Sequence, residues 1–358
     1  MTILGIETSC DETAAAVLTQ ENKKISVLSQ TIASSLDLHA KTGGIIPEVA
    51  AREQLRYIIS VIEKTLADAK KTLSTIDAIA VTYGPGLIGS LLVGVETAKT
   101  LSFVHQIPLI PINHLYGHIF ANWIDRDNDT CTFPALALIV SGGHTDIVVM
   151  RSKDQLQWIG GTRDDAAGEC FDKCARLLGF PYPGGPKISE LAKHGDPNFY
   201  QLPQPMPGAN NFDFSFSGLK TAFMNLVKKE FQLSDVALHN NKFNWAHIEE
   251  KGTTKEKQNI YDMCASLEKT IVENIVKKTI LAAKKYDVKT ILVGGGVSAN
   301  KLLRKTLETK CQENDFVLHI PQPIYCTDNA AMIAAAALIN PKAMPLADIN
   351  ATPDLYFA

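Results

Sequence analysis

The sequence lacks several patterns that would assign a protein to a class at once. None of its seven cysteines forms a CxxC pair, so reduced thiols of a cytoplasmic protein are the simplest interpretation. No apolar run is long enough to span a membrane. Strand-like sequence begins one residue after Met1, which leaves no room for a signal or transit peptide. We therefore expect a soluble cytoplasmic protein with no membrane partner.

An excess of charge of one sign is also missing. The chain has 35 basic and 38 acidic residues and a net charge of −3, so no global attraction to nucleic acid is expected. A local patch is the remaining route. Residues 260–310 carry ten basic and five acidic side chains, a balance of +5, which makes them a candidate RNA-facing segment. A solvated lysine face on a helix is the plainer alternative.

What the sequence does contain is a repeated order of elements. With 358 residues, 46% of them hydrophobic, it can bury a large core as two domains or lobes. In each half a strand, a polar turn, a return strand and a third strand follow one another. The predicted strands cover residues 3–9, 14–19 and 25–30, and then 135–140, 145–150 and 155–160. This shared order favours an internal duplication within an α/β protein.

Two histidines provide the most specific chemical signal. His114 and His118 follow the strand-like run 108–112 and would share one face of a helix, where two imidazoles can chelate a metal ion. A solvated helix face is the alternative. Leu115 excludes a zincin, which requires glutamate directly after the first histidine. Asp328 precedes an alanine-rich helix predicted at 330–339, and it could serve as an oxygen ligand or only as the helix cap.

Other polar turns at strand ends are candidates for binding and catalysis. Asp11 and Glu12 place two carboxylates after the first strand, which suits a site that handles amines, hydroxyls or metal-bound phosphate. Glycine-rich segments at 84–90 and 294–300 precede helices and could expose backbone N–H groups to an anion. A tight turn with close packing explains such glycines equally well.

Nine segments in one fixed order carry a family resemblance. They are IETSCDET (6–13), GPGLIGSLLVG (84–94), HLYGH (114–118), VSGGHT (140–145), GECFDKCARLLG (168–179), YPGGP (182–186), FSFSGLKT (214–221), GGGVSAN (294–300) and TDNAAMIA (327–334). The chain resembles the tRNA N6-adenosine threonylcarbamoyltransferases, formerly called O-sialoglycoprotein endopeptidases. Ile139 stands where archaeal and eukaryotic relatives carry tyrosine, which points to the bacterial branch. Gln54 departs from a common Arg-x-His, so its role is open.

The resemblance implies a fold and an activity. The fold is the duplicated, two-lobed α/β fold of actin, Hsp70 and sugar kinases, with the active site in the inter-lobe cleft. Lobe I would comprise residues 1–121 and 327–358, and lobe II residues 122–326 with a surface insertion at 231–257. The activity is transfer of a threonylcarbamoyl group from threonylcarbamoyl-adenylate to the exocyclic amine of the tRNA adenosine adjacent to the anticodon. An ATPase or sugar kinase on the same fold is the alternative.

The resemblance also implies site residues and partners. His114, His118 and Asp328 would hold one divalent metal ion per chain, Fe²⁺ in first place and Zn²⁺ as the alternative. The implied substrate-binding residues are Ile139, Val140, Ser141, Gly142, Gly143, Asp172, Gly185 and Asn300. Asp11 or Glu12 is our candidate for the base that takes the proton of the attacking amine. The implied partners are tRNA, a paralogous lobe protein and a small ATPase subunit.

Overall fold

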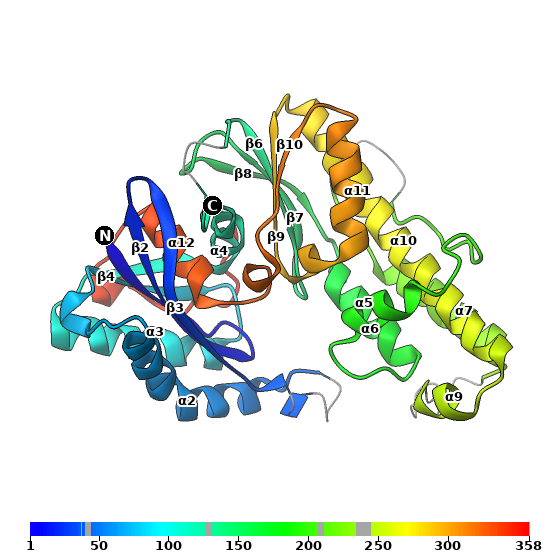
Figure 1. Ribbon diagram of the computed structural model, residues 1–358, viewed down its shortest axis with the longest axis horizontal. Helices are drawn as coiled ribbons and strands as arrows, with labels where there is room; N and C mark the ends of the chain where they lie inside the picture. The colour runs from blue at the N-terminus through cyan, green and yellow to red at the C-terminus, as the bar shows by residue number, and fades with distance from the viewer. Residues whose placement is uncertain (37, 40–43, 127–130, 207–210, 234–244, 358) are drawn as a thin grey trace.

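The computed structural model describes all residues except 37, 40–43, 127–130, 207–210, 234–244 and 358. Two five-stranded sheets lie in two lobes side by side (Figure 1). The first sheet has the order β3-β2-β1-β4-β5, with β1 (Thr2–Glu7), β2 (Glu12–Glu21), β3 (Lys24–Ser34), β4 (Ala78–Gly84) and β5 (Leu109–Asn113). The second has the order β10-β9-β6-β7-β8, with β6 (Ala135–Val140), β7 (Thr145–Met150), β8 (Leu156–Gly161), β9 (Thr290–Gly294) and β10 (Val317–His319).

The two sheets share one topology. In each, three consecutive strands pair antiparallel, and two later strands are added in parallel on the other side of the first strand. The turns β1–β2 and β6–β7 therefore occupy equivalent positions in the two lobes. Every residue of β6 and β7 is buried because both faces of the sheet are covered, as expected for central strands of an α/β fold. The predicted two-lobed, duplicated α/β fold is confirmed.

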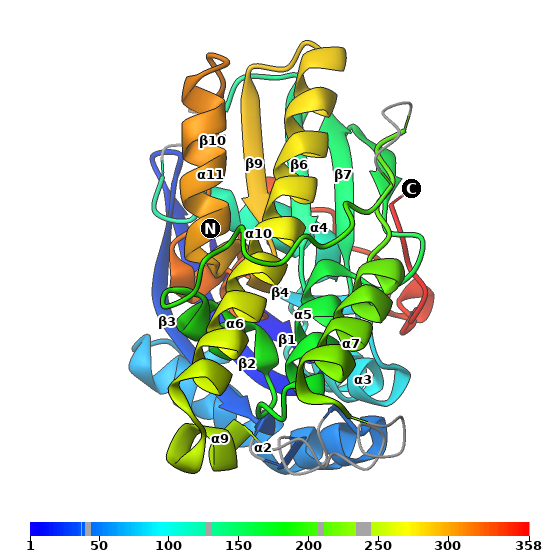
Figure 2. The same cartoon turned by 90° about the vertical axis from the view of Figure 1, so that its right-hand side faces the viewer.

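Helices cover both sheets. The first sheet carries α2 (Pro47–Asp68), α3 (Ile88–His105), α4 (His114–Phe120) and α12 (Ala330–Ile339). The second lobe contains α5 (Ala167–Leu177), α6 (Gly184–Ala192), α7 (Ser217–Phe231), α9 (Trp245–Lys251), α10 (Thr254–Lys285) and α11 (Lys301–Gln312). Figure 2 shows α10 running along the outer side of this lobe beside α5, α6 and α7. Within the described residues, no helix is both long and apolar enough to cross a membrane.

The C-terminal helix α12 packs directly on the N-terminal strands. Its residues from Ala330 to Leu338 are all buried, and their small side chains allow a close approach to β1 and β2. At Gly5 there is no room for a side chain, because a Cβ would lie 2.5 Å from the carbonyl oxygen of Ala330. This contact fixes where α12 begins. The boundaries of the two lobes at residues 121 and 326 stay a prediction.

The segment 231–257, predicted as a surface insertion of irregular structure, is largely helical in the second half, which the structure describes, and its status as an insertion stays a prediction. Its last part forms α9 and the first turn of α10, while residues 234–244 lie outside the described residues. Trp245 and Ile248, three residues apart, share a helical face that is buried in the core of the second lobe. The Trp245 ring lies 5.7 Å from that of Phe180. Because the segment is mostly polar in composition, the sequence alone did not predict that these two residues are buried.

The lysine-rich patch also needs a correction. Lys278 on α10 is buried, its Nζ donates a hydrogen bond to the carbonyl oxygen of Asp213, and it lies 5.4 Å from the Phe214 ring centroid. Lys277, Lys284 and Lys285 are exposed on the same helix. Lys278 therefore belongs to the core and not to an RNA-facing surface, and its burial lowers its pKa.

A glycine pair tests the packing of α12 on β1. Gly5→Ala should lower the free energy of unfolding by about 1–3 kcal/mol, because the added methyl group overlaps the Ala330 carbonyl. Gly218→Ala on α7 is the matched control, since its Cβ would meet nothing within 4 Å. Urea unfolding of both variants is the measurement. Equal stability of Gly5→Ala and the parent chain would contradict this account of the interface.

Candidate metal centre and substrate cleft

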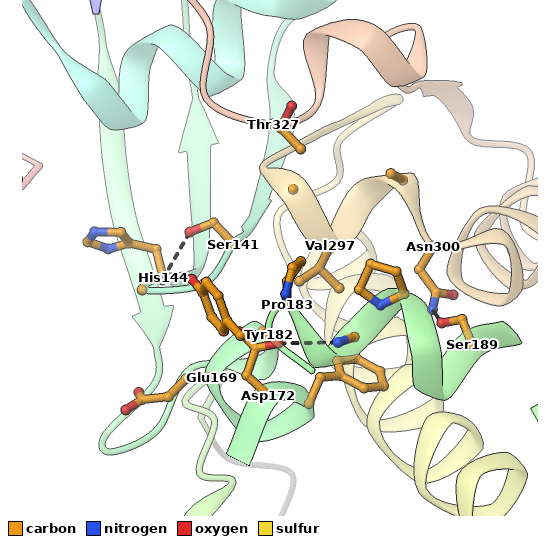
Figure 3. Close-up of a pocket in the computed structure, with 18 of the residues that line it drawn as sticks. Ser141, His144, Glu169, Asp172, Tyr182, Pro183, Ser189, Val297, Asn300 and Thr327 are labelled. Atoms are coloured by element: carbon orange, nitrogen blue, oxygen red, sulfur yellow. Dashed lines mark hydrogen bonds between the residues drawn. The ribbon is translucent and has the colours of Figure 1, made fainter. Parts of the chain in front are cut away.

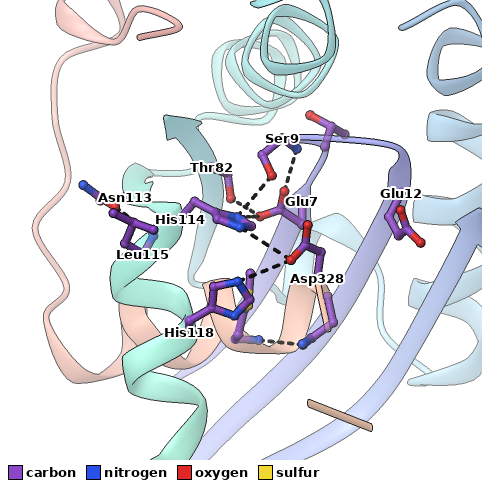
Figure 4. A network of polar contacts seen from close by, with 12 residues as sticks. Glu7, Ser9, Glu12, Thr82, Asn113, His114, Leu115, His118 and Asp328 are labelled. Atoms are coloured by element: carbon purple, nitrogen blue, oxygen red, sulfur yellow. Dashed lines mark hydrogen bonds and ion pairs between the residues drawn. The ribbon is translucent and has the colours of Figure 1, made fainter. Parts of the chain in front are cut away.

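Three predicted ligands come together between β5, α4 and the start of α12. His114 is the first residue of α4 and His118 lies one turn later, so both rings project from one face of the helix (Figure 4). Asp328 Oδ1 lies 3.5 Å from His114 Nε2 and 3.3 Å from His118 Nε2. The ligand atoms all lie within 4.8 Å of one another, so one ion could contact all three. The cap of α12 is Asn329, whose side chain accepts from the Met332 amide, so Asp328 is not needed for capping.

The environment of the histidines fits a metal ion. His118 is completely buried, and neither of its ring nitrogens has a hydrogen-bond partner among the described residues. An ion at Nε2 would relieve that cost. His114 Nδ1 lies 3.1 Å from Glu7 Oε2 and 3.1 Å from Ser9 Oγ. A carboxylate that accepts from Nδ1 leaves Nε2 with its lone pair toward the ligand position, a common arrangement around metal-bound histidine.

Glu7 is a site residue that the sequence analysis did not single out. It ends the apolar strand β1 and is 1% exposed, with Oε2 accepting from Thr82 Oγ1 at 2.5 Å and Oε1 accepting from the Ser9 amide at 2.6 Å. Burial alone would raise its pKa, but the neighbouring His114 lowers it below the usual value. The signal that the sequence offers for this role is a glutamate at the end of an otherwise apolar strand.

The ionisable side chains of the site shift one another's pKa values. Burial by itself would lower the pKa of His114, but the carboxylates of Glu7 and Asp328 outweigh it and raise that pKa to about 10. The pKa of Asp328 is held well below its usual value because His114, and also His118, outweigh the effect of burial. Burial lowers the pKa of His118. A metal ion bound at His114 Nε2 would therefore replace a proton there, so binding releases that proton.

The candidate metal-binding triad, His114, His118 and Asp328, borders a cleft between the lobes. The cleft has a volume of about 1460 Å³ and is lined by the equivalent turns of both sheets, Ser9–Glu12 and Ser141–His144, and by His114 and Asp328. The two turns, which occupy equivalent positions in the two lobes, therefore face one cleft. Tyr182 also lines the cleft, and after burial the charge of Asp11 is the next cause that raises its pKa.

The two carboxylates of the first turn differ in character. Glu12 Oε1 accepts from Ser34 Oγ at 3.0 Å, and its side chain is turned away from the histidines (Figure 4). Burial and the neighbouring Asp11 raise the pKa of Glu12 to about 9, which leaves it protonated at neutral pH. Asp11 is 9% exposed and lines the cleft. Of the two, Asp11 is the side chain that could act as a base.

Gln54 holds this turn in place. The side chain is fully buried in α2, and its Nε2 donates toward the carbonyl oxygens of Cys10 and Glu12, both at 3.0 Å, and of Thr8 at 3.3 Å. A single amide group therefore fixes both sides of the acidic turn from a helix more than forty residues away in the chain. This is the structural role of the position that departs from the family pattern.

Residues at the far end of the cleft form a hydrogen-bonded frame (Figure 3). Asp172 Oδ1 accepts from the amides of Gly184 at 2.8 Å and Gly185 at 3.2 Å, although burial raises the pKa of this carboxyl. Asn300 caps α11 through the Leu303 amide, and its Nδ2 donates to Ser189 Oγ and Glu268 Oε1. Asp172, Gly185 and Asn300 all line the cleft.

The β6–β7 turn presents backbone to the cleft. Gly142 and Gly143 are exposed, do not adopt a left-handed φ, and would meet nothing within 4 Å of an added Cβ. Neither strain nor internal packing requires glycine there, so room for a ligand is the remaining physical reason. Ser141 Oγ accepts from the His144 amide at 3.1 Å. Ile139 and Val140 have fully buried side chains, so any contact they make to a substrate would be through the backbone.

The fold and the site define a class: two-lobed α/β proteins with a cluster of His, His and Asp in the inter-lobe cleft that could hold a metal ion. The chain matches the family model "TsaD: tRNA N6-adenosine threonylcarbamoyltransferase" over residues 26–335. It is 46% identical over 357 residues to the tRNA N6-adenosine threonylcarbamoyltransferase of Listeria welshimeri, covering 99% of this chain and 96% of that protein. The enzyme of Geobacillus kaustophilus is 45% identical, with 99% and 96% covered. The chain therefore belongs to the tRNA N6-adenosine threonylcarbamoyltransferase family.

A solved structure supports the fold independently. HypF from T. kodakarensis matches with a TM-score of 0.58 at 12% identity, covering 94% of this chain and 47% of that one. Membership of the family confirms the predicted activity: the chain is a transferase that forms threonylcarbamoyladenosine in tRNA. The alternative of an ATPase or sugar kinase finds no support in these comparisons.

Metal analysis tests the triad. Purified chain should contain about one metal ion, and both His118→Ala and Asp328→Ala should lose it, because each removes a ligand from a three-residue site. His194→Ala removes an exposed histidine outside the triad and is the matched control. Elemental analysis of the four proteins is the measurement. Full occupancy in both ligand variants would exclude the triad as the metal site.

Proposed function

We propose that the cleft transfers threonylcarbamoyl from threonylcarbamoyl-adenylate to the exocyclic amine of the tRNA adenosine adjacent to the anticodon. The observation that carries this proposal is the position of the metal-binding triad beside two equivalent turns that line one cleft. A small donor can lie inside such a cleft while a polynucleotide approaches its open edge. The direct test is single-turnover transfer from the adenylate to unmodified tRNA, with phosphate transfer to small alcohols as the control reaction.

Each part of the cleft takes one task in this proposal. Asp172, Gly185 and Asn300 form the frame that holds the adenylate part of the donor. Backbone N–H groups of Gly142 and Gly143 lie in open cleft and can donate to the oxyanion that develops at the carbamoyl carbon. The N- and O-rich triad suits Fe²⁺ or Zn²⁺, and the bound ion would supply Lewis-acid polarisation and orientation of the donor. We take Fe²⁺ as the first candidate.

The amine must lose a proton as it attacks, and Asp11 is positioned to accept it. Its carboxyl lines the cleft, whereas Glu12 is protonated at neutral pH and hydrogen-bonded to Ser34. The proton passes from the exocyclic nitrogen to the carboxylate, the new C–N bond forms, and the bond to the adenylate phosphate breaks. The departing phosphate is a good leaving group and needs no acid.

A pair of isosteric variants tests this base. Asp11→Asn should slow single-turnover transfer about 10²- to 10⁴-fold, the usual effect of removing a general base, with metal content and adenylate affinity retained. Glu12→Gln should have a much smaller effect, because it replaces an acid that is already neutral. A near-normal rate for Asp11→Asn would show that this side chain only stabilises its own turn.

Further proposed partners are a paralogous lobe protein and a small ATPase subunit, with the cytoplasm as the place of action. An exposed apolar groove between α2 and α3 supports a protein partner on the first lobe. Leu55, Ile59 and Leu92 line it and are 66%, 52% and 45% exposed. Exposed apolar side chains gathered in one groove are typical of protein–protein contact sites.

The exposed lysines of α10 are proposed to contact tRNA phosphates. Exchange of Lys277, Lys284 and Lys285 for glutamate should weaken tRNA binding and flatten its dependence on salt, because fewer counterions are released. Adenylate binding should not change. Titrations at several salt concentrations are the measurement, and Lys278 is left intact because it is buried. If tRNA affinity stays at the parent value, the phosphate contacts lie elsewhere.

A further inference from the structure

A cluster of aromatic side chains joins the two lobes at the edge of the cleft. Tyr356, near the C-terminus, lies with its ring centroid 6.2 Å from His144, 6.1 Å from Trp158 and 5.5 Å from Phe357. Phe357 in turn lies 5.7 Å from Tyr116 on α4. We call these five residues the aromatic cluster. Three of them, Trp158, Tyr356 and Phe357, lie outside the family motifs and outside the mechanism above. Tyr116 and His144 lie within motifs, but the mechanism gives neither side chain a role.

The C-terminal segment is tied to the site on both sides. The Thr352 amide donates to the Tyr83 carbonyl at 2.7 Å, and the Pro353 carbonyl accepts from the Gly86 amide at 3.1 Å. Asn113, which caps the metal-binding helix α4, donates through Nδ2 to the Tyr356 carbonyl at 3.2 Å. His144 lines the cleft from the other lobe. Tyr356 therefore lies between the start of the metal-binding helix and the glycine turn.

A buried carboxylate fixes the orientation of the cluster. Asp146 is 1% exposed, and its Oδ1 accepts hydrogen bonds from Trp158 Nε1 at 2.9 Å and from the Tyr356 hydroxyl. Its Oδ2 lies 3.6 Å from His144 Nδ1. Two rings from distant segments, Trp158 and Tyr356, are thus held by one carboxylate oxygen, and the His144 ring lies close to the other oxygen without a hydrogen bond. Despite this, Tyr356 is 42% exposed, which is unusual for an aromatic ring so firmly held.

The neighbourhood of the cluster suits a nucleobase. The guanidinium of Arg163 lies 5.9 Å from the Trp158 ring centroid, and its side chain is 60% exposed. Rigid aromatic rings with an adjacent arginine are what proteins offer to unpaired RNA bases. The chain has a net charge of −3, so contacts to phosphate groups alone would give it a low affinity for tRNA. A target adenosine that enters the cleft must also leave its stacked neighbours.

We propose that the aromatic cluster stacks against an unpaired base of the tRNA loop that carries the target adenosine. The proposal rests on tRNA being the substrate and names the surface that receives the loop. In Figure 3 His144 lies at the opposite edge of the pocket from Asn300, so the adenylate frame and the base platform take different ends of one cleft. The loop then enters past His144, and the target amine reaches the donor from that side.

Two substitutions of Tyr356 separate stacking from structural support. Tyr356→Phe keeps the ring and loses the hydrogen bond to Asp146, whereas Tyr356→Leu loses both. We expect Tyr356→Leu to bind unmodified anticodon stem-loop RNA about tenfold more weakly, and Tyr356→Phe to stay within about twofold of the parent chain. The salt dependence of binding should not change in either variant, because stacking neutralises no phosphate. Phe103→Leu, which removes a ring that is 67% exposed on α3, is the control.

A fluorescent base gives a direct readout. Stem-loop RNA with 2-aminopurine beside the target position should be quenched by the parent chain and by Tyr356→Phe, and not by Tyr356→Leu at saturating protein. If Tyr356→Phe and Tyr356→Leu lose the same amount of RNA binding and quenching, the role of Tyr356 is its hydrogen bond to Asp146. That result would refute stacking by the aromatic cluster. Normal binding and quenching by Tyr356→Leu would overturn it as well. A parent chain that neither binds nor modifies tRNA would instead refute the proposed function.

Discussion

The contact between Gly5 and the first turn of α12 is the constraint on which the metal centre depends. Asp328 lies two residues before α12, so its place relative to the histidines is set by how closely that helix sits on β1. A side chain at position 5 would displace the Ala330 carbonyl and shift the third ligand by a comparable distance. Since metal–ligand distances tolerate only a few tenths of an ångström, this packing contact would decide whether the three side chains can hold one ion. The alanine-rich sequence of α12 follows from the same need for close approach.

Ionised side chains can be buried beside α4 because each lies next to a hydrogen-bond donor or an imidazole ring. Glu7 is satisfied by the Thr82 hydroxyl and the Ser9 amide while it faces His114, and Asp328 faces both histidines. Isolated ionised groups at this depth would change protonation state instead. His118 has the weakest contacts of this group: its Nε2 lies 3.3 Å from Asp328 Oδ1, and neither ring nitrogen makes a hydrogen bond among the described residues. A ring nitrogen buried beside a carboxylate without a hydrogen bond fits a site that takes a ligand.

Sequence reasoning succeeded where local pattern and position decide the outcome. Strands β6 and β7 and helix α12 have the predicted bounds, because apolar runs bounded by polar turns determine them. The structure brings His114, His118 and Asp328 together as motif spacing and resemblance predicted, and metal binding by them stays a prediction. Glu7 and Asp146 were not identified, and the role of Gln54 stayed open, because each acts through hydrogen bonds to segments that are distant in the chain. The buried Lys278 and Trp245 were misjudged since composition suggested a polar surface, while burial depends on which helical face meets the core.

The duplicated fold explains why one cleft can serve two substrates of very different size. Equivalent turns from the two sheets meet at the cleft, but their sequences have diverged: the first turn carries carboxylates, and the second carries glycines with free backbone. One turn can therefore accept a proton while the other donates hydrogen bonds to developing negative charge. The C-terminal segment then crosses from one lobe to the other and brings Tyr356 to Asp146. Because Asn113 caps α4 and also donates to the Tyr356 carbonyl, this crossing links the aromatic cluster on the second lobe to the start of the helix that carries His114 and His118.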